Sequence, residues 1–185
     1  MEPGERVTTE GGELIRLVSG DEIRARVREL AEDISARYAG EEVLCVCVLK
    51  GAFLFFADLV RRLSVPAVID FVRLSSYGAG TKRGSDLRFS KDLEESVAGR
   101  NVLVVEDIVD SGRSMAYFKD VLAGRGPKSL KVCALVDKQE RREVEFEVDL
   151  VGFNLTGRGF LVGYGMDHAE RYRDLDGIYE LVRTR

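Results

Sequence analysis

Residues 102–115 read Val-Leu-Val-Val-Glu-Asp-Ile-Val-Asp-Ser-Gly-Arg-Ser-Met, and this stretch predicts the fold. The apolar run 102–105 is typical of a strand that is buried on both faces in a parallel sheet. Beyond Ser114, apolar residues recur at spacings of three and four, which predicts a helix. The sequence therefore places two acids, Glu106 and Asp107, at the carboxyl end of a central strand, and a turn of small residues at the start of a helix.

The turn 110–114 has the chemistry of a phosphate site. The backbone N–H groups of such a turn, together with the N-terminus of the following helix, attract an anion. Ser111 and Ser114 add hydroxyl donors, and Gly112 lets the backbone approach a ligand closely. The preceding acids suit ribose hydroxyls or a magnesium ion. Ligands of open α/β sheets bind at the carboxyl ends of the strands, so we expect a sugar phosphate with a bound metal.

The whole stretch resembles the phosphoribosyl diphosphate signature of the type I phosphoribosyltransferases, and it matches that signature at every position. The resemblance implies that the 5′-phosphate is bound by Asp110, Ser111, Gly112, Arg113 and Ser114. It also implies that Glu106 and Asp107 bind the ribose and Mg²⁺. Asp110 is the candidate catalytic residue, exchanging a proton with N7 of a purine. The turn alone leaves a response-regulator-like domain open, because strand, acid, glycine and helix recur in many α/β folds.

Composition narrows the class of protein. The chain has 185 residues, of which 45% are hydrophobic and 32% charged, so we expect residues 1–185 to form a single globular domain. A net charge of −4 argues against a general binder of nucleic acid or anionic membranes. No apolar stretch reaches the ~18 residues of a membrane span, and no signal peptide is apparent, so we expect a cytoplasmic protein. Cys45, Cys47 and Cys133 are expected to be buried free thiols.

The rest of the chain alternates between strand and helix patterns. We expect strands over residues 43–49, 67–74, 130–136, 148–155 and 160–165, and helices over 20–38 and 53–63. We also expect a hairpin within 6–18, a solvated edge over 140–147, a short helical segment over 166–175 and an edge strand over 178–182. These elements predict an α/β fold with a central, mostly parallel sheet flanked by helices, to which the resemblance adds a small hood over the purine site.

Two segments at strand ends are candidates for ligand contacts. Lys50 and Gly51 follow the strand 43–49, and Leu49-Lys50-Gly51 is similar to a pyrophosphate-binding turn of the family branch that acts on hypoxanthine and guanine. The glycine-rich loop 75–86 is long enough to be a lid, and its opening, with Ser76 and Tyr77, looks like the family's lid. The alternatives are an ordinary strand-exit lysine and a plain exposed hairpin.

The purine end is assigned by the resemblance alone. It implies that Lys138 donates to the 6-oxo oxygen, Phe160 stacks on the purine, and the backbone of Leu161 meets the purine edge. It further implies that Asp167 lies beside purine and metal, and that Arg173 binds pyrophosphate. Without the resemblance, Lys138 would be a surface charge, Phe160 a core residue and Arg173 part of a surface ion pair.

The activity implied is transfer of the 5-phosphoribosyl group from phosphoribosyl diphosphate to N9 of a 6-oxopurine, by a homodimer or homotetramer. His168 and residues 156–159 depart from the family pattern, which leaves the preference among hypoxanthine, guanine and xanthine open. A non-catalytic regulator that binds nucleotide and RNA would need a basic face, and this acidic chain has no obvious one. Lys138 together with Phe160-Leu161 argues against a phosphoribosyltransferase for adenine or orotate.

Overall fold

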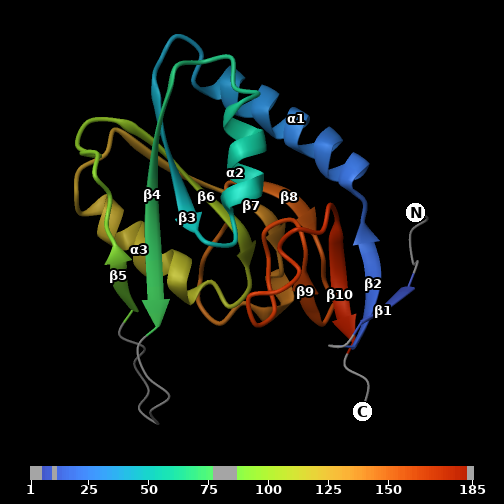
Figure 1. Cartoon of the computed structure of the whole chain (residues 1–185). Helices are drawn as coiled ribbons and strands as arrows, with labels where there is room; N and C mark the ends of the chain where they lie inside the picture. Colours follow the sequence, from blue (N-terminus) through green and yellow to red (C-terminus); the bar gives the residue numbers. More distant parts are fainter. Residues whose placement is uncertain (1–5, 10–11, 77–86, 183–185) are drawn as a thin grey trace.

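The computed structural model describes residues 6–9, 12–76 and 87–182, and it contains a large and a small sheet (Figure 1). The six strands of the large sheet are, in spatial order, β5 (Leu87–Lys91), β4 (Ala67–Ser76), β3 (Val43–Leu49), β6 (Asn101–Val109), β7 (Ser129–Asp137) and β8 (Leu150–Asn154). The small sheet orders β1 (Arg6–Thr9), β2 (Gly12–Val18), β10 (Ile178–Val182) and β9 (Phe160–Val162). We call the small sheet together with residues 163–177 the hood.

The large sheet is parallel from β4 through β3, β6 and β7 to β8, and β5 pairs antiparallel with β4 at the edge. The expected central, mostly parallel sheet is therefore confirmed, although no strand was expected at the position of β5. Parallel strands end at the same side of a sheet. The carboxyl ends of β3, β6 and β7 consequently meet, and these are the ends that carry the candidate site residues.

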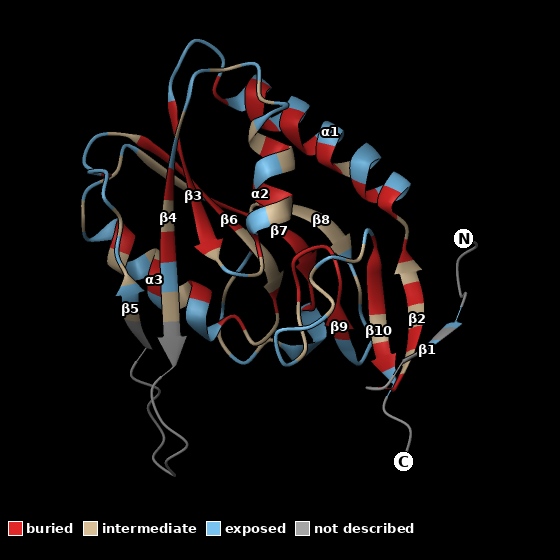
Figure 2. Ribbon diagram, viewed as in Figure 1, coloured by how far each residue is buried: buried red, intermediate tan, exposed pale blue. Residues whose placement is uncertain are grey.

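Helices cover both faces of the large sheet (Figure 1). Apolar residues of α1 (Gly20–Arg37) and α2 (Phe53–Val60) share one core with alternate residues of β3, β6 and β7. The intervening residues of these strands pack with Met115, Phe118 and Leu122 of α3 (Arg113–Ala123) in a second core. Figure 2 shows the resulting concentration of buried residues in the central strands. None of the helices in these described ranges is long and apolar enough to cross a membrane.

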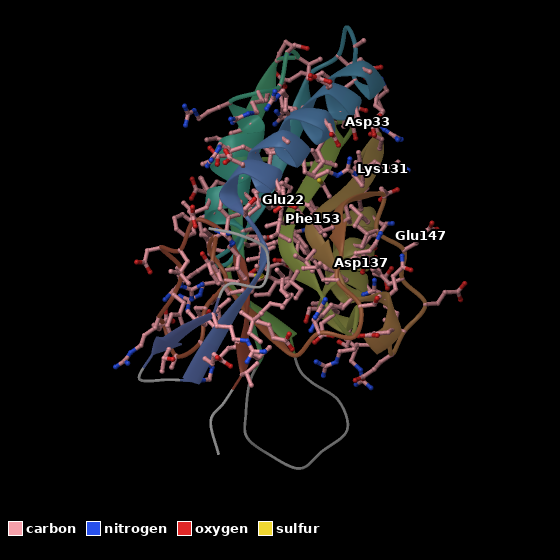
Figure 3. All side chains as sticks on the ribbon, turned by 90° about the vertical axis from the view of Figure 1, so that its right-hand side faces the viewer. Glu22, Asp33, Lys131, Asp137, Glu147 and Phe153 are labelled. Atoms are coloured by element: carbon pink, nitrogen blue, oxygen red, sulfur yellow. The ribbon has the colours of Figure 1, made fainter. Side chains whose placement is uncertain are left out.

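A capping box formed by Ser19 and Glu22 begins α1. The Ser19 hydroxyl accepts a hydrogen bond from the Glu22 N–H at 3.3 Å, and Glu22 Oε2 accepts one from the Ser19 N–H at 2.8 Å. Glu22 and Asp33 lie toward opposite ends of this helix (Figure 3). Cys45 and Cys47 are free and buried, as expected, and burial raises the pKa of both thiols to about 12.

The hood corrects two expectations. β10 is not an edge strand, because it pairs with β2 on one side and β9 on the other. The segment 166–175 forms tight turns closed by two isolated bridges, Gly163 to Met166 and His168 to Arg171, rather than a helical segment. Ala169 and Glu170 have positive φ angles of 53° and 61°, which a right-handed helix does not accommodate.

Candidate active site

Two adjoining cavities lie at the carboxyl ends of the central strands. The first measures about 300 Å³ and is bounded by residues 106–112 and Ser114, with Gly51 opposite. The second measures about 390 Å³ and is bounded by Lys138 and by residues of the hood. Asp107 and Asp110 line both cavities. The fold therefore brings the candidate phosphate site and the candidate purine site to a common wall.

The candidate phosphate turn joins β6 to α3. Gly112 occupies the N-cap position of α3 with φ of 80°, a left-handed conformation that glycine adopts without strain. Ser111, Gly112 and Ser114 line the first cavity, as the prediction requires. The Arg113 side chain is instead engaged by Glu143, with Nε 2.5 Å from the carboxylate, so only its backbone is a candidate for phosphate binding.

The two acids at the end of β6 are held in different ways. A Cβ atom on Gly51 would lie 1.8 Å from Oδ2 of Asp107, so this carboxylate rests directly on the glycine that follows β3. Glu106 accepts the Asp107 N–H at 3.0 Å. Burial raises the pKa of Glu106 well above its usual range, and the neighbouring Asp107 charge adds to the effect. A cation or ribose hydroxyls would stabilise such a carboxylate pair.

The donor set fits a divalent metal only with help from a ligand. Within the described ranges, no three acidic, histidine or cysteine side chains are grouped closely enough to hold a metal ion by themselves. Mg²⁺ commonly uses one or two carboxylates together with substrate phosphates and water. Glu106 and Asp107 in the first cavity, with Asp167 in the second, meet that requirement.

The two predicted pyrophosphate residues come together around a residue that the sequence analysis missed. Glu170 binds Lys50 Nζ at 3.0 Å through Oε1 and Arg173 Nη2 at 3.1 Å through Oε2. These contacts lower the pKa of Glu170, that with Lys50 most and that with Arg173 next. Arg173 also contacts Asp167 at 2.8 Å. The sequence analysis expected a helical segment over 166–175 and therefore did not place Glu170 near Lys50. In the structure Glu170 lies in a turn with a positive φ angle, and this conformation directs its carboxylate toward the two cations.

The backbone around Lys50 is also tightly packed. The Leu49–Lys50 peptide bond is cis. A Cβ atom on Gly165 would lie 2.1 Å from the carbonyl oxygen of Gly51, so the hood rests on the turn that follows β3. Gly51 is thus enclosed between Asp107 and the hood, and a larger residue has no room there.

Lys138, Phe160, Leu161 and Asp167, the residues expected at the purine end, all line the second cavity. Lys138 is only 2% exposed, and its Nζ donates to the carbonyl oxygens of Arg158 at 2.9 Å and Gly159 at 2.6 Å. Burial lowers the pKa of this ammonium. Phe160 is 53% exposed and therefore not a core residue, while Leu161 is buried. Both line the cavity, so a planar ligand there can stack on an open aromatic face.

Asp110 lies at the junction of the two sites. Its Oδ1 atom is buried without a hydrogen-bond partner among the described residues, although Arg141 Nε lies 3.3 Å away. Buried polar atoms normally have a hydrogen-bond partner, and a ligand in the cavity would supply one here. Arg141, which the sequence analysis placed on a solvated edge, lines the second cavity.

The lid expectation remains a prediction. The backbone of β4 ends at Ser76, and Tyr77 and the rest of the loop up to residue 86 lie outside the described residues.

Comparison with known proteins identifies the family. A family model for the phosphoribosyl transferase domain matches residues 17–169. A hypoxanthine phosphoribosyltransferase of Salmonella typhimurium is 45% identical over 163 residues, which cover 87% of this chain and 91% of the relative. The crystal structure of a hypoxanthine-guanine phosphoribosyltransferase from Bacillus anthracis superposes with a TM-score of 0.86 at 42% identity, over 90% of this chain and 98% of that one. A hypoxanthine phosphoribosyl transferase from Trypanosoma cruzi gives a TM-score of 0.84 at 37% identity, over 90% of each chain. The chain therefore belongs to the phosphoribosyltransferase family that its phosphate turn resembles.

Proposed function

We propose that the chain transfers the 5-phosphoribosyl group of phosphoribosyl diphosphate to N9 of hypoxanthine or guanine, giving IMP or GMP and pyrophosphate, in purine salvage. The observation that carries the proposal is the wall of Asp107 and Asp110 shared by the two cavities. A sugar phosphate in the first cavity would present its anomeric carbon to a base in the second.

The phosphate turn binds the 5′-phosphate in this account. Successive backbone N–H groups and the N-terminus of α3 favour a dianion, and the hydroxyls of Ser111 and Ser114 add hydrogen bonds. These contacts hold the sugar while the bond at its anomeric carbon breaks, which lowers the entropic part of the barrier.

The diphosphate leaves toward the Lys50 and Arg173 side chains. As the bond from the anomeric carbon to the diphosphate oxygen breaks, the two cations stabilise the charge that accumulates on the departing group. Glu106 and Asp107 bind the ribose hydroxyls and lie near the positive charge that develops on the sugar. The donor set of Glu106, Asp107 and Asp167 suits Mg²⁺, which when bound would neutralise diphosphate oxygens.

The base is recognised by its 6-oxo group and by its flat face. An ammonium has three N–H donors, and Lys138 uses two of them on backbone carbonyls, so the third is available for a 6-oxo oxygen. Phe160 stacks on the ring, and the backbone of Leu161 meets its edge. As N9 bonds to the anomeric carbon, Asp110 accepts the proton from N7, and one such transfer typically contributes ~10²–10⁴-fold.

The remaining assignments extend the same proposal. Ser76 and Tyr77 belong to a lid that excludes water from the reacting sugar, and residues 1–185 act as a single domain in the cytoplasm. The protein assembles as a homodimer or homotetramer. In the Trypanosoma cruzi relative, the C-terminal region has been studied for its role in oligomeric state and enzymatic activity.

A direct assay tests the proposed reaction. The protein is incubated with MgCl₂, phosphoribosyl diphosphate and, separately, hypoxanthine, guanine, xanthine, adenine or orotate, and the nucleotides are identified by mass spectrometry. We expect IMP or GMP with stoichiometric pyrophosphate. Formation of only AMP or orotidine monophosphate, or of no nucleotide with active substrate stocks, would refute the proposal.

A further inference from the structure

Arg142 lies beneath the phosphate turn rather than on a solvated edge. Its side chain is only 14% exposed, and its Nη2 forms an ion pair with Oδ1 of Asp137, which is 1% exposed. Its Nη1 donates to the carbonyl oxygen of Asp110 at 2.9 Å. A Cβ atom on Gly112 would lie 2.7 Å from Arg142 Cδ, and the guanidinium lies 5.8 Å from the centre of the Phe146 ring. The Arg142 side chain is thus held by Asp137, by the carbonyl group of Asp110 and by packing against Gly112 and Phe146.

Residues 142 and 143 hold two consecutive carbonyl groups of the turn. Arg142 binds the carbonyl of Asp110, and the Glu143 N–H donates to the carbonyl of Ser111 at 2.9 Å. In a trans peptide the N–H points opposite to the C=O. The N–H groups of Ser111 and Gly112 are therefore turned away from residues 142 and 143. Ser111 and Gly112 both line the first cavity, so their N–H groups are available to a phosphate bound there.

The ion pair with Asp137 fixes the plane of the guanidinium. Asp137 ends β7 (Figure 3), the strand that pairs with β6, so its position is set by the sheet and not by the turn. A guanidinium is planar, and a carboxylate on Nη2 fixes the direction in which Nη1 points. Removing one partner of a buried pair leaves an uncompensated charge, so the two residues act as a unit.

We infer that Arg142, anchored by Asp137, is a positioning residue for the 5′-phosphate. It touches no substrate itself and acts through the peptide planes between Asp110 and Gly112. The inference rests on the proposed function, because it concerns the same phosphate site. It predicts a selective effect: substrates that carry the 5′-phosphate should bind more weakly when Arg142 is changed, while the KM of the base should not follow.

Steady-state kinetics of Arg142→Gln test this selectivity. We expect the KM for phosphoribosyl diphosphate to rise by about 10- to 100-fold, because a misplaced contact of ~1 Å can cost two orders of magnitude. The KM for hypoxanthine and kcat at saturating phosphoribosyl diphosphate should stay within about threefold. Isothermal titration with IMP should show a matching loss of affinity. Arg142→Lys, which retains the charge but not the planar fork, should fall between wild type and Arg142→Gln.

A double mutant tests the anchoring role of Asp137. Residues that act as a unit are not additive. Asp137→Asn should raise the same KM, and the double variant should be no worse than Arg142→Gln alone. If the increases in KM for phosphoribosyl diphosphate of the two single variants multiplied in the double variant, the two residues would act independently and Asp137 would not anchor Arg142.

Arg100→Gln is the matched control for general destabilisation. Arg100 is 24% exposed and pairs with two carboxylates, Glu42 and Glu95, just before β6 begins and away from both cavities. It should lower the melting temperature without raising the KM for phosphoribosyl diphosphate. An unchanged KM in folded Arg142→Gln, or in Arg142→Lys if the glutamine variant does not fold, would overturn the inference. Loss of the proposed function itself would appear differently, as absence of IMP and GMP formation by the wild type.

Discussion

Lys50 Nζ lies 3.0 Å from Oε1 of Glu170, a residue 120 positions later in the chain. The other oxygen of the same carboxylate binds Arg173. One exposed side chain of the hood therefore occupies both cations that the proposed reaction assigns to diphosphate. The carboxylate must leave them when diphosphate binds, which makes Glu170 a competitor of the ligand.

Glu170→Gln should strengthen the binding of diphosphate. Exposed ion pairs contribute about 0.2–1 kcal/mol each, so the loss of two such pairs should lower the KM for phosphoribosyl diphosphate by about 2- to 30-fold. The inhibition constant of pyrophosphate should fall in parallel, since both ligands use the same cations. Asp33→Asn removes a comparable exposed pair, with Arg37 on α1, and should change neither constant. A higher KM in Glu170→Gln would show that the carboxylate assists binding instead.

Gly51→Ala should disable the acid pair. The added methyl group would lie 1.8 Å from Asp107 Oδ2, so the carboxylate must move away from its place between the cavities. We expect kcat/KM to fall by about 100-fold, with a higher Mg²⁺ concentration needed for half-maximal activity. Gly124→Ala is the control, because its Cβ would make only ordinary contacts at 3.5 Å and beyond. Normal activity of Gly51→Ala would remove Asp107 from the ribose and metal site.

Lys138→Gln should lose recognition of the base and retain that of the sugar phosphate. A hydrogen bond to a charged group contributes about 1.5–3 kcal/mol, so kcat/KM for hypoxanthine should fall by roughly 10- to 100-fold. The KM for phosphoribosyl diphosphate should change little. Lys131→Gln provides the control, because Lys131 lies on β7, the strand that Lys138 follows, and is paired with Asp149. Equal losses for both substrates would indicate that Lys138 serves the structure of the hood and not the 6-oxo group.

Asp70 should make stability depend on pH. It is 4% exposed and accepts the N–H groups of Phe71, Glu94 and Glu95. Burial opposes ionisation, but these hydrogen bonds outweigh it and hold the pKa of Asp70 below its usual value. A lowered folded-state pKa contributes stability that is complete above the unfolded pKa of about 3.9 and is lost as pH falls below it.

Asp70→Asn therefore tests that linkage. Urea denaturation at pH 7 should show a loss of about 1–3 kcal/mol, because an amide replaces a carboxylate that accepts three N–H groups. The difference from wild type should stay constant between pH 7 and pH 5 and shrink toward pH 3. A difference that does not vary with pH would exclude ionised Asp70 as its source.

The sequence predicts the parts of this protein that local pattern determines. The strand, acid pair and turn of 102–115 appear in the structure as β6 and the start of α3, and the capping box begins α1. The predicted phosphate, ribose, pyrophosphate and purine residues, apart from the Arg113 side chain, lie where the ends of β3, β6 and β7 meet the hood. Of the predicted lid residues, Ser76 ends β4 and Tyr77 lies outside the described residues. The strands and turns are predictable because apolar runs and small-residue turns act over a few residues, and parallel strands carry their ends to one edge.

The rest depends on contacts between distant segments. Glu170 adopts a left-handed conformation, which usually occurs at glycine, and no glycine stands at this position to indicate it. The sequence therefore suggested a helical segment where the chain forms turns. β10 has the same apolar pattern whether one neighbour or two flank it. Arg142 was expected on a solvated edge among acidic residues, and only its ion pair with the buried Asp137 shows that it is enclosed. Pairing and burial of this kind are tertiary properties that a single sequence does not display.

In the proposed reaction the turn 110–114 binds a phosphate while the neighbouring cavity binds a base. A crystal structure with bound IMP would show both contacts at once. We expect the phosphate to accept hydrogen bonds from the backbone N–H groups of residues 111–114, with the hypoxanthine ring against Phe160 and its 6-oxo oxygen on Lys138. A phosphate bound away from these N–H groups, or a base outside the cavity that Lys138 and Phe160 line, would contradict it.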